Sequence, residues 1–254
     1  MQSTLIQAFH AFSTRYGGVS TGEFSEMTFG STRGDDPDAV RENYRRWCGL
    51  FGADDDRCCV TLQVHGNAVK VVTAGDRHDP MGDVPYEADG LVTGERNLPI
   101  FCFTADCVPV LLWDAEEKSA GAVHCGWKSS VKDILGNAMS AMREFGTKPE
   151  NIRAALGPAI GKCCFETDRD VPEAIERYLG GDTDGLWTVR PDGKYMVDLR
   201  AANARRLVQL GIPKEAIDIS DECTVCSHEK YWSARYCARS NVRRGSLSAG
   251  IVLR

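Results

Sequence analysis

Two apolar segments near the middle of the chain limit the fold more than any other feature. They span residues 99–103 and 108–113, and neither contains a charged residue. Continuous apolar runs of this length are typical of strands that are buried on both faces of a sheet. The turn between them contains Asp106 and Cys107. Because an unpaired buried carboxylate is energetically costly, we expect a hydrogen-bond donor or a cation next to Asp106.

The remaining strand and helix patterns do not alternate regularly along the chain. Helical spacing of apolar residues predicts helices over 38–51, 130–145, 171–179 and 198–210. Strand-like patterns cover 58–74, 88–93, 120–125, 152–156, 217–223 and 249–253. Ser130 is expected to cap the second helix at its N-terminus, with Asp133 three residues later. The irregular order predicts an α+β fold, a single domain of residues 1–254 with layered mixed β-sheets flanked by helices.

The composition argues against several classes of partner. The 254 residues are 43% apolar and 26% charged, and their net charge of -6 provides no basic field for nucleic acid. Apolar runs stay well below the roughly 20 residues of a membrane span, and the first residues lack the pattern of a signal peptide. We therefore expect a cytoplasmic protein that is a monomer or a small homo-oligomer.

Cysteine is abundant, with 11 residues at irregular spacings. In a chain without a secretion signal, this pattern favours reduced thiols over a disulfide framework. The segment Cys223-x-x-Cys226-x-His228 has the spacing of zinc ligands. One such pair without a second is not sufficient to predict a structural zinc site.

Three candidate metal ligands lie on or at the ends of apolar strands: His65, Cys107 and His124. We place His65 on the polar face of the expected strand 58–74, opposite Leu62 and Val64. Two imidazoles and a thiolate suit zinc, and three protein ligands leave a fourth position for water or substrate, as in catalytic zinc sites. Because sequence separation does not report distance, a histidine without a chemical role is the alternative interpretation of His65.

Two cationic positions are candidates for anion binding. Arg15 lies beside Gly17-Gly18, and a glycine loop can turn backbone N–H groups toward an anion, although a hairpin turn is the simpler interpretation. Lys128 follows His124 closely, and the expected helix start at Ser129-Ser130 adds further N–H donors. Both positions therefore suit a phosphate group.

Seven motifs occur in order over nearly the whole chain and together resemble one protein family. They are Phe12-Ser-Thr-Arg15 with Gly17-Gly18-Val19-Ser20, Gln63-Val-His65, Ala88-Asp89-Gly90 with Thr93, Ala105-Asp106-Cys107-x-Pro109, Val123-His124-Cys125-Gly126-Trp127-Lys128, Gly157-Pro158-x-Ile160-Gly161 with Cys164-x-Glu166, and Ser233-x-Arg235. The chain is similar to the YfiH-type family of purine nucleoside phosphorylases. The same family carries the older label polyphenol oxidase or laccase, and some bacterial members are labelled peptidoglycan editing factors.

The resemblance implies a zinc ion bound at the positions that match His65, Cys107 and His124. It also implies phosphorolysis of adenosine, inosine, guanosine and methylthioadenosine to the base plus ribose 1-phosphate, with adenosine deamination as a side activity. The implied partners are purine nucleosides and phosphate. Arg15 matches an arginine associated with the active site. Asp106 is our candidate for the catalytic acid or base, with the ordering of a ligand or a loop as the alternative role.

The chain departs from the family pattern at two places. Where the family usually has His-Ala-Gly-Trp-Arg-Gly, this chain has His124-Cys-Gly-Trp-Lys128-Ser129. The C-terminal motif has Ala234-Arg235-Tyr236 where relatives have an Arg-Arg dipeptide after Ser-x. Lysine cannot reproduce the bidentate contacts of arginine, so the first departure concerns anion affinity or substrate choice.

Other activities use the same residues. In a cysteine-dependent hydrolase that edits peptidoglycan precursors, Cys107 is the nucleophile and His124 its base. A copper-dependent polyphenol oxidase is a weaker alternative, because five histidines without a His-x-His pair cannot supply a multicopper cluster. A site that only binds a ligand would hold zinc without nucleoside turnover.

Overall fold

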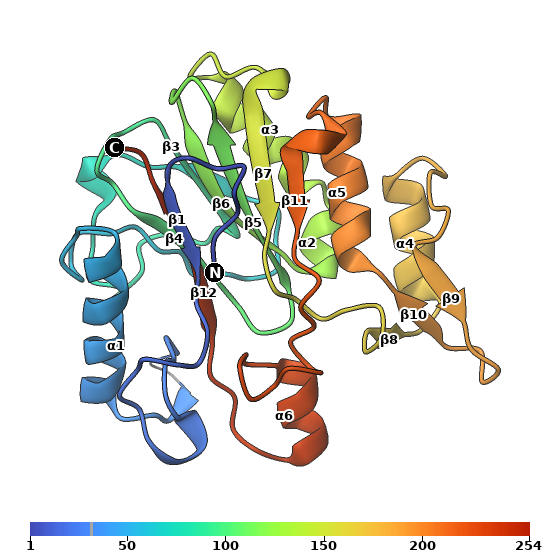
Figure 1. The fold of residues 1–254 in the computed structure, drawn as a ribbon, viewed down its shortest axis with the longest axis horizontal. Helices are drawn as coiled ribbons and strands as arrows, with labels where there is room; N and C mark the ends of the chain where they lie inside the picture. The colour runs from blue at the N-terminus through green and yellow to red at the C-terminus, as the bar shows by residue number, and fades with distance from the viewer. Residues whose placement is uncertain (31–32) are drawn as a thin grey trace.

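Two β-sheets pack face to face at the centre of the molecule in the computed structural model, which describes residues 1–30 and 33–254 (Figure 1). The larger sheet contains, in spatial order, β11 (Ile217–Ile219), β7 (Ile152–Leu156), β5 (Val108–Asp114), β6 (Ala120–Cys125), β3 (Gly90–Thr93) and β2 (Val69–Val71). The smaller sheet contains β1 (Phe9–Phe12), β12 (Leu247–Val252) and β4 (Ile100–Thr104). The larger sheet is mixed: β11 runs parallel to β7 and β2 parallel to β3, whereas the other neighbours are antiparallel.

Helices cover the outer faces of both sheets. The α-helices are α1 (Pro37–Leu50), α2 (Trp127–Val131), α3 (Ile134–Arg143), α4 (Asp170–Tyr178), α5 (Leu199–Gln209) and α6 (Ala234–Ser240). Short 3-10 turns lie at Gly22–Phe24, Ala74–Asp76, Pro149–Asn151 and Lys214–Ala216. Trp47 of α1 and Phe51, the residue that follows this helix, pack against Phe101 of β4 on the smaller sheet. Helices α3 and α5 lie on the opposite side, against the larger sheet (Figure 1).

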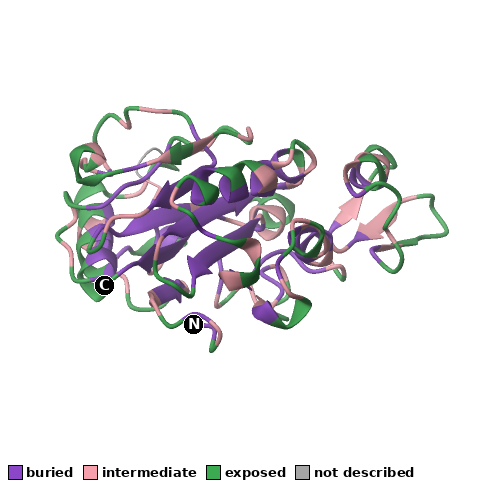
Figure 2. Ribbon diagram, turned by 90° about the horizontal axis from the view of Figure 1, so that it is seen from above, coloured by how far each residue is buried: buried purple, intermediate pink, exposed green. Residues whose placement is uncertain are grey.

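A third, small sheet lies at the periphery beside α4. Its strands are β8 (Glu166–Thr167), β10 (Tyr195–Val197) and β9 (Trp187–Val189). Figure 2 shows it projecting from the buried centre, with mostly partly buried and exposed residues. No helix among residues 1–30 and 33–254 is long and apolar enough to cross a membrane.

The predicted α+β fold with layered mixed sheets and flanking helices is confirmed. The two apolar segments form β4 and β5, and all residues of β5 are buried, as expected for a strand covered on both faces. They belong to different sheets, however. The turn between them therefore carries the chain from one sheet to the other, and it places Cys107 where the sheets meet.

The prediction of a strand over 58–74 was wrong. Only β2 is a regular strand there, and Cys58, Cys59 and Leu62 form isolated bridges. The physical reason is a competing acceptor, because the backbone N–H groups of residues 64–66 donate to a buried carboxylate instead of a neighbouring strand. Leu62 and Val64 are consequently 51% and 47% exposed, not buried on an apolar face.

The helix predicted over 130–145 is two helices, α2 and α3. Ser130 lies inside α2, where its hydroxyl donates to the carbonyl of Gly126 at 3.0 Å, so it does not cap a helix. The cap of α3 is Asp133, which adopts a left-handed φ of 62° and accepts the N–H of Gly136. The expected helix start at Ser129-Ser130 therefore does not exist, and α2 begins at Trp127.

Candidate metal centre

His65, Cys107 and His124 converge, with one donor atom from each lying within 4.8 Å of the other two. We refer to these three residues as the metal-site triad. Strand register explains two of the positions: Pro109 pairs with His124 across β5 and β6, so Cys107 lies just before the paired segment. His124 is 3% exposed, whereas His65 is exposed and Cys107 is partly buried. The triad is thus anchored in the core and open on one side.

Asp89 holds both histidines in place. Its buried carboxylate accepts the backbone N–H groups of Val64, His65 and Gly66 at 3.1, 3.0 and 2.7 Å. It also accepts Nδ1–H of His124 at 2.8 Å, which leaves Nε2 of that ring free for a metal. Burial alone would raise the pKa of Asp89, but the hydrogen bonds from His124 and the backbone hold it below its usual value.

The ionisation of the imidazoles follows from their neighbours. Burial acts to lower the pKa of His124, but its interactions with Cys107 and with the Asp89 carboxylate outweigh burial and raise that pKa to about 9. Burial and the nearby charge of His124 lower the pKa of His65. Without a metal, the pocket therefore holds a proton on His124, and a bound cation takes the place of that proton.

Gly126 provides the space that the triad needs. A Cβ atom added to this residue would lie 2.7 Å from Nδ1 of His65 and 3.1 Å from Sγ of Cys107. Its φ of -68° is ordinary, so the requirement for glycine here is close approach and not backbone conformation. The donor set and this close packing fit a tetrahedral ion such as zinc, with one position left for water or substrate.

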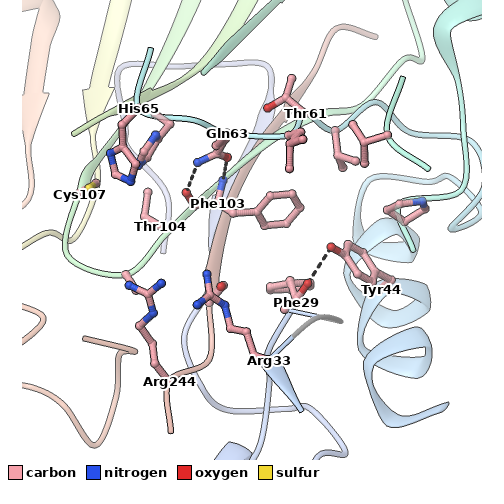
Figure 3. Close-up of a pocket in the computed structure, with 18 of the residues that line it drawn as sticks. Phe29, Arg33, Tyr44, Thr61, Gln63, His65, Phe103, Thr104, Cys107 and Arg244 are labelled. Atoms are coloured by element: carbon pink, nitrogen blue, oxygen red, sulfur yellow. Dashed lines mark hydrogen bonds between the residues drawn. The ribbon is translucent and has the colours of Figure 1, made fainter. Parts of the chain in front are cut away.

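The triad stands between two cavities of about 640 and 330 Å³. His65, Cys107 and Arg244 line both of them. In the larger cavity, the ring of Phe103 projects between the triad and Tyr44 (Figure 3). Gln63 fixes the backbone of Phe103 through two hydrogen bonds of 2.7 Å, one in each direction. The larger cavity therefore combines an aromatic surface with the metal-site triad.

Arg33 and Arg244 line the same cavity, and their guanidinium groups lie side by side opposite Gln63 (Figure 3). Burial and the nearby charge of Arg244 lower the pKa of Arg33. Within the part of the chain that the structure describes, neither guanidinium group forms an ion pair or a side-chain hydrogen bond. Two neighbouring cations in one cavity form a natural anion site.

The other predicted site residues lie around the triad or away from it. The Asp106 carboxylate accepts the hydroxyl of Thr224 and the backbone N–H of Arg235, both at 2.6 Å. The expected donors beside Asp106 are therefore present. These contacts tie the loop before Cys107 to the C-terminal part of the chain, and the catalytic role of Asp106 stays a prediction.

Neither Arg15 nor Lys128 lines the two cavities. The guanidinium of Arg15 donates to the carbonyls of Ser25 and His228, and it stacks 3.9 Å above the ring of Trp232. Lys128 is exposed on α2, with its ammonium group 5.7 Å from the Trp127 ring. The cations that the structure brings into the larger cavity are Arg33 and Arg244.

Three residues of the site, Asp89, Arg33 and Arg244, are not among those predicted from the sequence. Asp89 had a usable signal, because an aspartate at the start of an apolar strand needs buried donors. Arg244 lies in a basic pair in the C-terminal tail, and Arg33 in a polar segment near the N-terminus, 211 positions apart by residue number. Only the fold brings the two arginines together.

The sequence matches the family described as multi-copper polyphenol oxidoreductase laccase over residues 9–254. The chain belongs to this family. A Corynebacterium glutamicum relative named purine nucleoside phosphorylase is 34% identical over 214 residues, which are 84% of this chain and 83% of the relative. A Geobacillus stearothermophilus relative named purine nucleoside phosphorylase YlmD is 32% identical over 233 residues, covering 90% and 85% of the two chains.

Solved structures show the same fold. The crystal structure of YlmD from Geobacillus stearothermophilus superimposes with a TM-score of 0.91 at 29% identity, covering 99% of this chain and 94% of that one. The Bacillus licheniformis hypothetical protein YfiH gives 0.90 at 30% identity, with 98% and 93% covered. The resemblance inferred from the seven motifs is therefore confirmed at the level of family and fold.

Proposed function

We propose that this protein is a zinc-dependent purine nucleoside phosphorylase. It converts adenosine, inosine, guanosine and methylthioadenosine with phosphate into the base and ribose 1-phosphate, and it deaminates adenosine as a side activity. The observation that carries the proposal is one cavity that contains both an open metal-site triad and the neighbouring arginines Arg33 and Arg244. The names of the relatives support the same activity.

The larger cavity suits a nucleoside and phosphate together. Its volume of about 640 Å³ is in the range of small-molecule sites. Phe103 offers a face for a purine ring, and we infer that the hydroxyls of Thr61 and Thr104, which line the same cavity, contact the ribose. Arg33 and Arg244 supply the charge and bidentate geometry that hold phosphate against the sugar. These are the protein's main contributions to cleavage, because phosphorolysis depends on positioning the two reactants.

The triad supplies the electrophilic side of the site. A zinc ion held there would provide Lewis-acid chemistry at the mouth of the cavity. Asp89 keeps Nδ1 of His124 protonated and Nε2 available, and it fixes the backbone that carries His65. We propose that Asp106 orders the loop that carries Cys107, since the carboxylate oxygens of Asp106 accept hydrogen bonds from the Thr224 hydroxyl and the Arg235 backbone N–H.

A cysteine-dependent hydrolase is the second candidate, and one observation favours it. Asp89, His124 and Cys107 form a carboxylate–imidazole–thiol series like that of a nucleophilic triad. His65 distinguishes the two functions, because a nucleophilic cysteine does not need a second imidazole within 4.8 Å. If the first function is correct, bound zinc should protect Cys107 from alkylation. Peptide mass mapping identifies which cysteines have been alkylated. Rapid alkylation of Cys107 in the zinc-loaded protein would favour the hydrolase.

The experiment for the proposed function is adenosine turnover by zinc-loaded protein with and without phosphate. Phosphorolysis should give adenine and ribose 1-phosphate only when phosphate is present. Deamination should give inosine whether or not phosphate is present. A His124→Ala variant removes a proposed ligand and should lose both activities. Undiminished turnover in that variant would overturn the assignment.

A further inference from the structure

Four cysteines form a second cluster away from the metal-site triad. The sulfur atoms of Cys163, Cys164, Cys223 and Cys226 all lie within 4.8 Å of one another. They come from two loops that follow β7 and β11. Because these neighbouring strands are parallel, both loops leave the same edge of the sheet (Figure 1). A bridge between Ala159 and Cys223 continues the pairing up to the cluster.

We propose that this cysteine cluster is a structural zinc site of the tetrathiolate type. Sγ of Cys226 lies 3.6 Å from that of Cys163 and 3.5 Å from that of Cys164. A tetrahedral zinc ion with Zn–S bonds of about 2.3 Å separates its sulfur ligands by about 3.8 Å. Four mutually neighbouring thiols match this geometry, whereas a disulfide joins only two sulfurs at about 2.05 Å. Each of the two loops contributes two cysteines, and Cys223-x-x-Cys226 has the spacing typical of structural zinc ligands.

The surroundings of the cluster suit a thiolate complex of net negative charge. The N–H of Gly161 donates to Sγ of Cys223 at 3.2 Å. A Cβ on Gly161 would lie 3.2 Å from both Sγ of Cys163 and a guanidinium nitrogen of Arg200, so glycine allows this approach. Arg200 is only 8% exposed, and no carboxylate pairs with it among the described residues. Four thiolates around a divalent ion carry a charge of about −2, which a neighbouring buried guanidinium compensates.

The cysteine cluster is connected to the wall of the candidate active site. Thr224 follows Cys223 directly and donates to Asp106, which precedes Cys107. The carbonyl of Cys164 accepts from the guanidinium of Arg235 at 3.2 Å. A metal in the cluster would therefore fix the loops that border the smaller cavity. The inference concerns metal binding and folding, and it does not depend on the proposed phosphorolysis.

The test is the zinc content of purified, reduced protein, measured by mass spectrometry of the metal. A Cys163→Ser/Cys226→Ser variant should contain one equivalent of zinc fewer than the wild type. Cys102→Ala, which removes a buried thiol outside both sites, should keep the wild-type content. His124→Ala should lose a different equivalent. Failure of the proposed triad site would abolish that second loss and would leave the loss in the double variant unchanged. Wild-type zinc content in the double variant would overturn the cysteine site.

A measurement without cysteine substitutions covers the case in which the double variant does not fold. X-ray absorption of His124→Ala protein loaded with one zinc should show only sulfur neighbours, at about 2.3 Å. A first shell containing nitrogen would contradict the proposal. Denatured, metal-stripped protein should contain 11 free thiols, and a stable disulfide among the four cysteines would also contradict it.

Discussion

Replacing Asp89 by asparagine tests how the protein orients the ligands of the proposed metal site. The Asp89 carboxylate accepts three backbone N–H groups and Nδ1–H of His124. Asparagine has one acceptor oxygen, and its NH2 group must face at least one of these donors. Hydrogen bonds to a charged acceptor contribute about 1.5–3 kcal/mol each. We therefore expect Asp89→Asn to lower the free energy of unfolding by about 2–4 kcal/mol.

Zinc affinity should fall separately from stability. Loss of a carboxylate that orients a metal-binding histidine typically costs about 10–100-fold in affinity, or about 1.4–2.7 kcal/mol. The assay is competition between protein and a zinc chelator, performed in the Cys163→Ser/Cys226→Ser background so that one site is measured. Denaturant unfolding of the metal-free protein gives the stability term.

Asp114→Asn is the matched control. Asp114 is also fully buried, and it accepts Oγ1–H of Thr147 at 2.6 Å and the N–H of Glu116 at 2.9 Å, at the far end of β5 from the triad. It should lose stability while zinc affinity changes less than about two-fold. Equal zinc affinities for Asp89→Asn and Asp114→Asn would refute the orienting role of Asp89.

Three further predictions concern the same site. Gly126→Ala should lower zinc affinity and turnover at least about ten-fold, because its Cβ would meet two triad residues, whereas Gly121→Ala has ordinary contacts and should change affinity little. Arg244→Gln should raise the KM for phosphate about ten-fold or more in steady-state assays. Substitution of its exposed neighbour, Arg243→Gln, should not raise this KM. Equal effects of the two substitutions would contradict the assignment of Arg244 to an anion site. Zinc binding should release protons below pH 9, since the pKa of His124 is raised to about 9 in the metal-free protein and zinc requires the neutral ring. Apparent affinity should therefore rise with pH up to about 9, and calorimetry in buffers of different ionisation enthalpy that shows no proton release would contradict this.

The features that could be predicted from sequence are those for which the neighbouring residues in the chain determine burial and secondary structure. The apolar runs predicted β4 and β5, and the strand before His124 was equally clear. Helices α1 and α5 lie within about two residues of their expected ends, because Asp36 and Asp198 are local caps. His65, Cys107 and His124 could be named as candidates because their residue types suit one metal.

The remaining features depend on contacts between distant segments. The segment around His65 has a strand-like pattern, but a carboxylate 24 residues later captures its N–H groups. Two apolar strands adjacent in sequence enter different sheets, which no local pattern indicates. Arg33 approaches Arg244, and Cys163 approaches Cys226, only after the sheets assemble. A single Cys-x-x-Cys pair was thus uninformative until the second pair was located in space.

The most direct test of the central claim is product analysis of adenosine incubated with zinc-loaded protein and phosphate. The metal-site triad and the Arg33–Arg244 pair share one cavity, so adenine and ribose 1-phosphate should form in equal amounts. Their formation should require phosphate and cease when zinc is chelated. Adenine that forms at the same rate without phosphate, or no adenine with the triad fully loaded with zinc, would contradict the account.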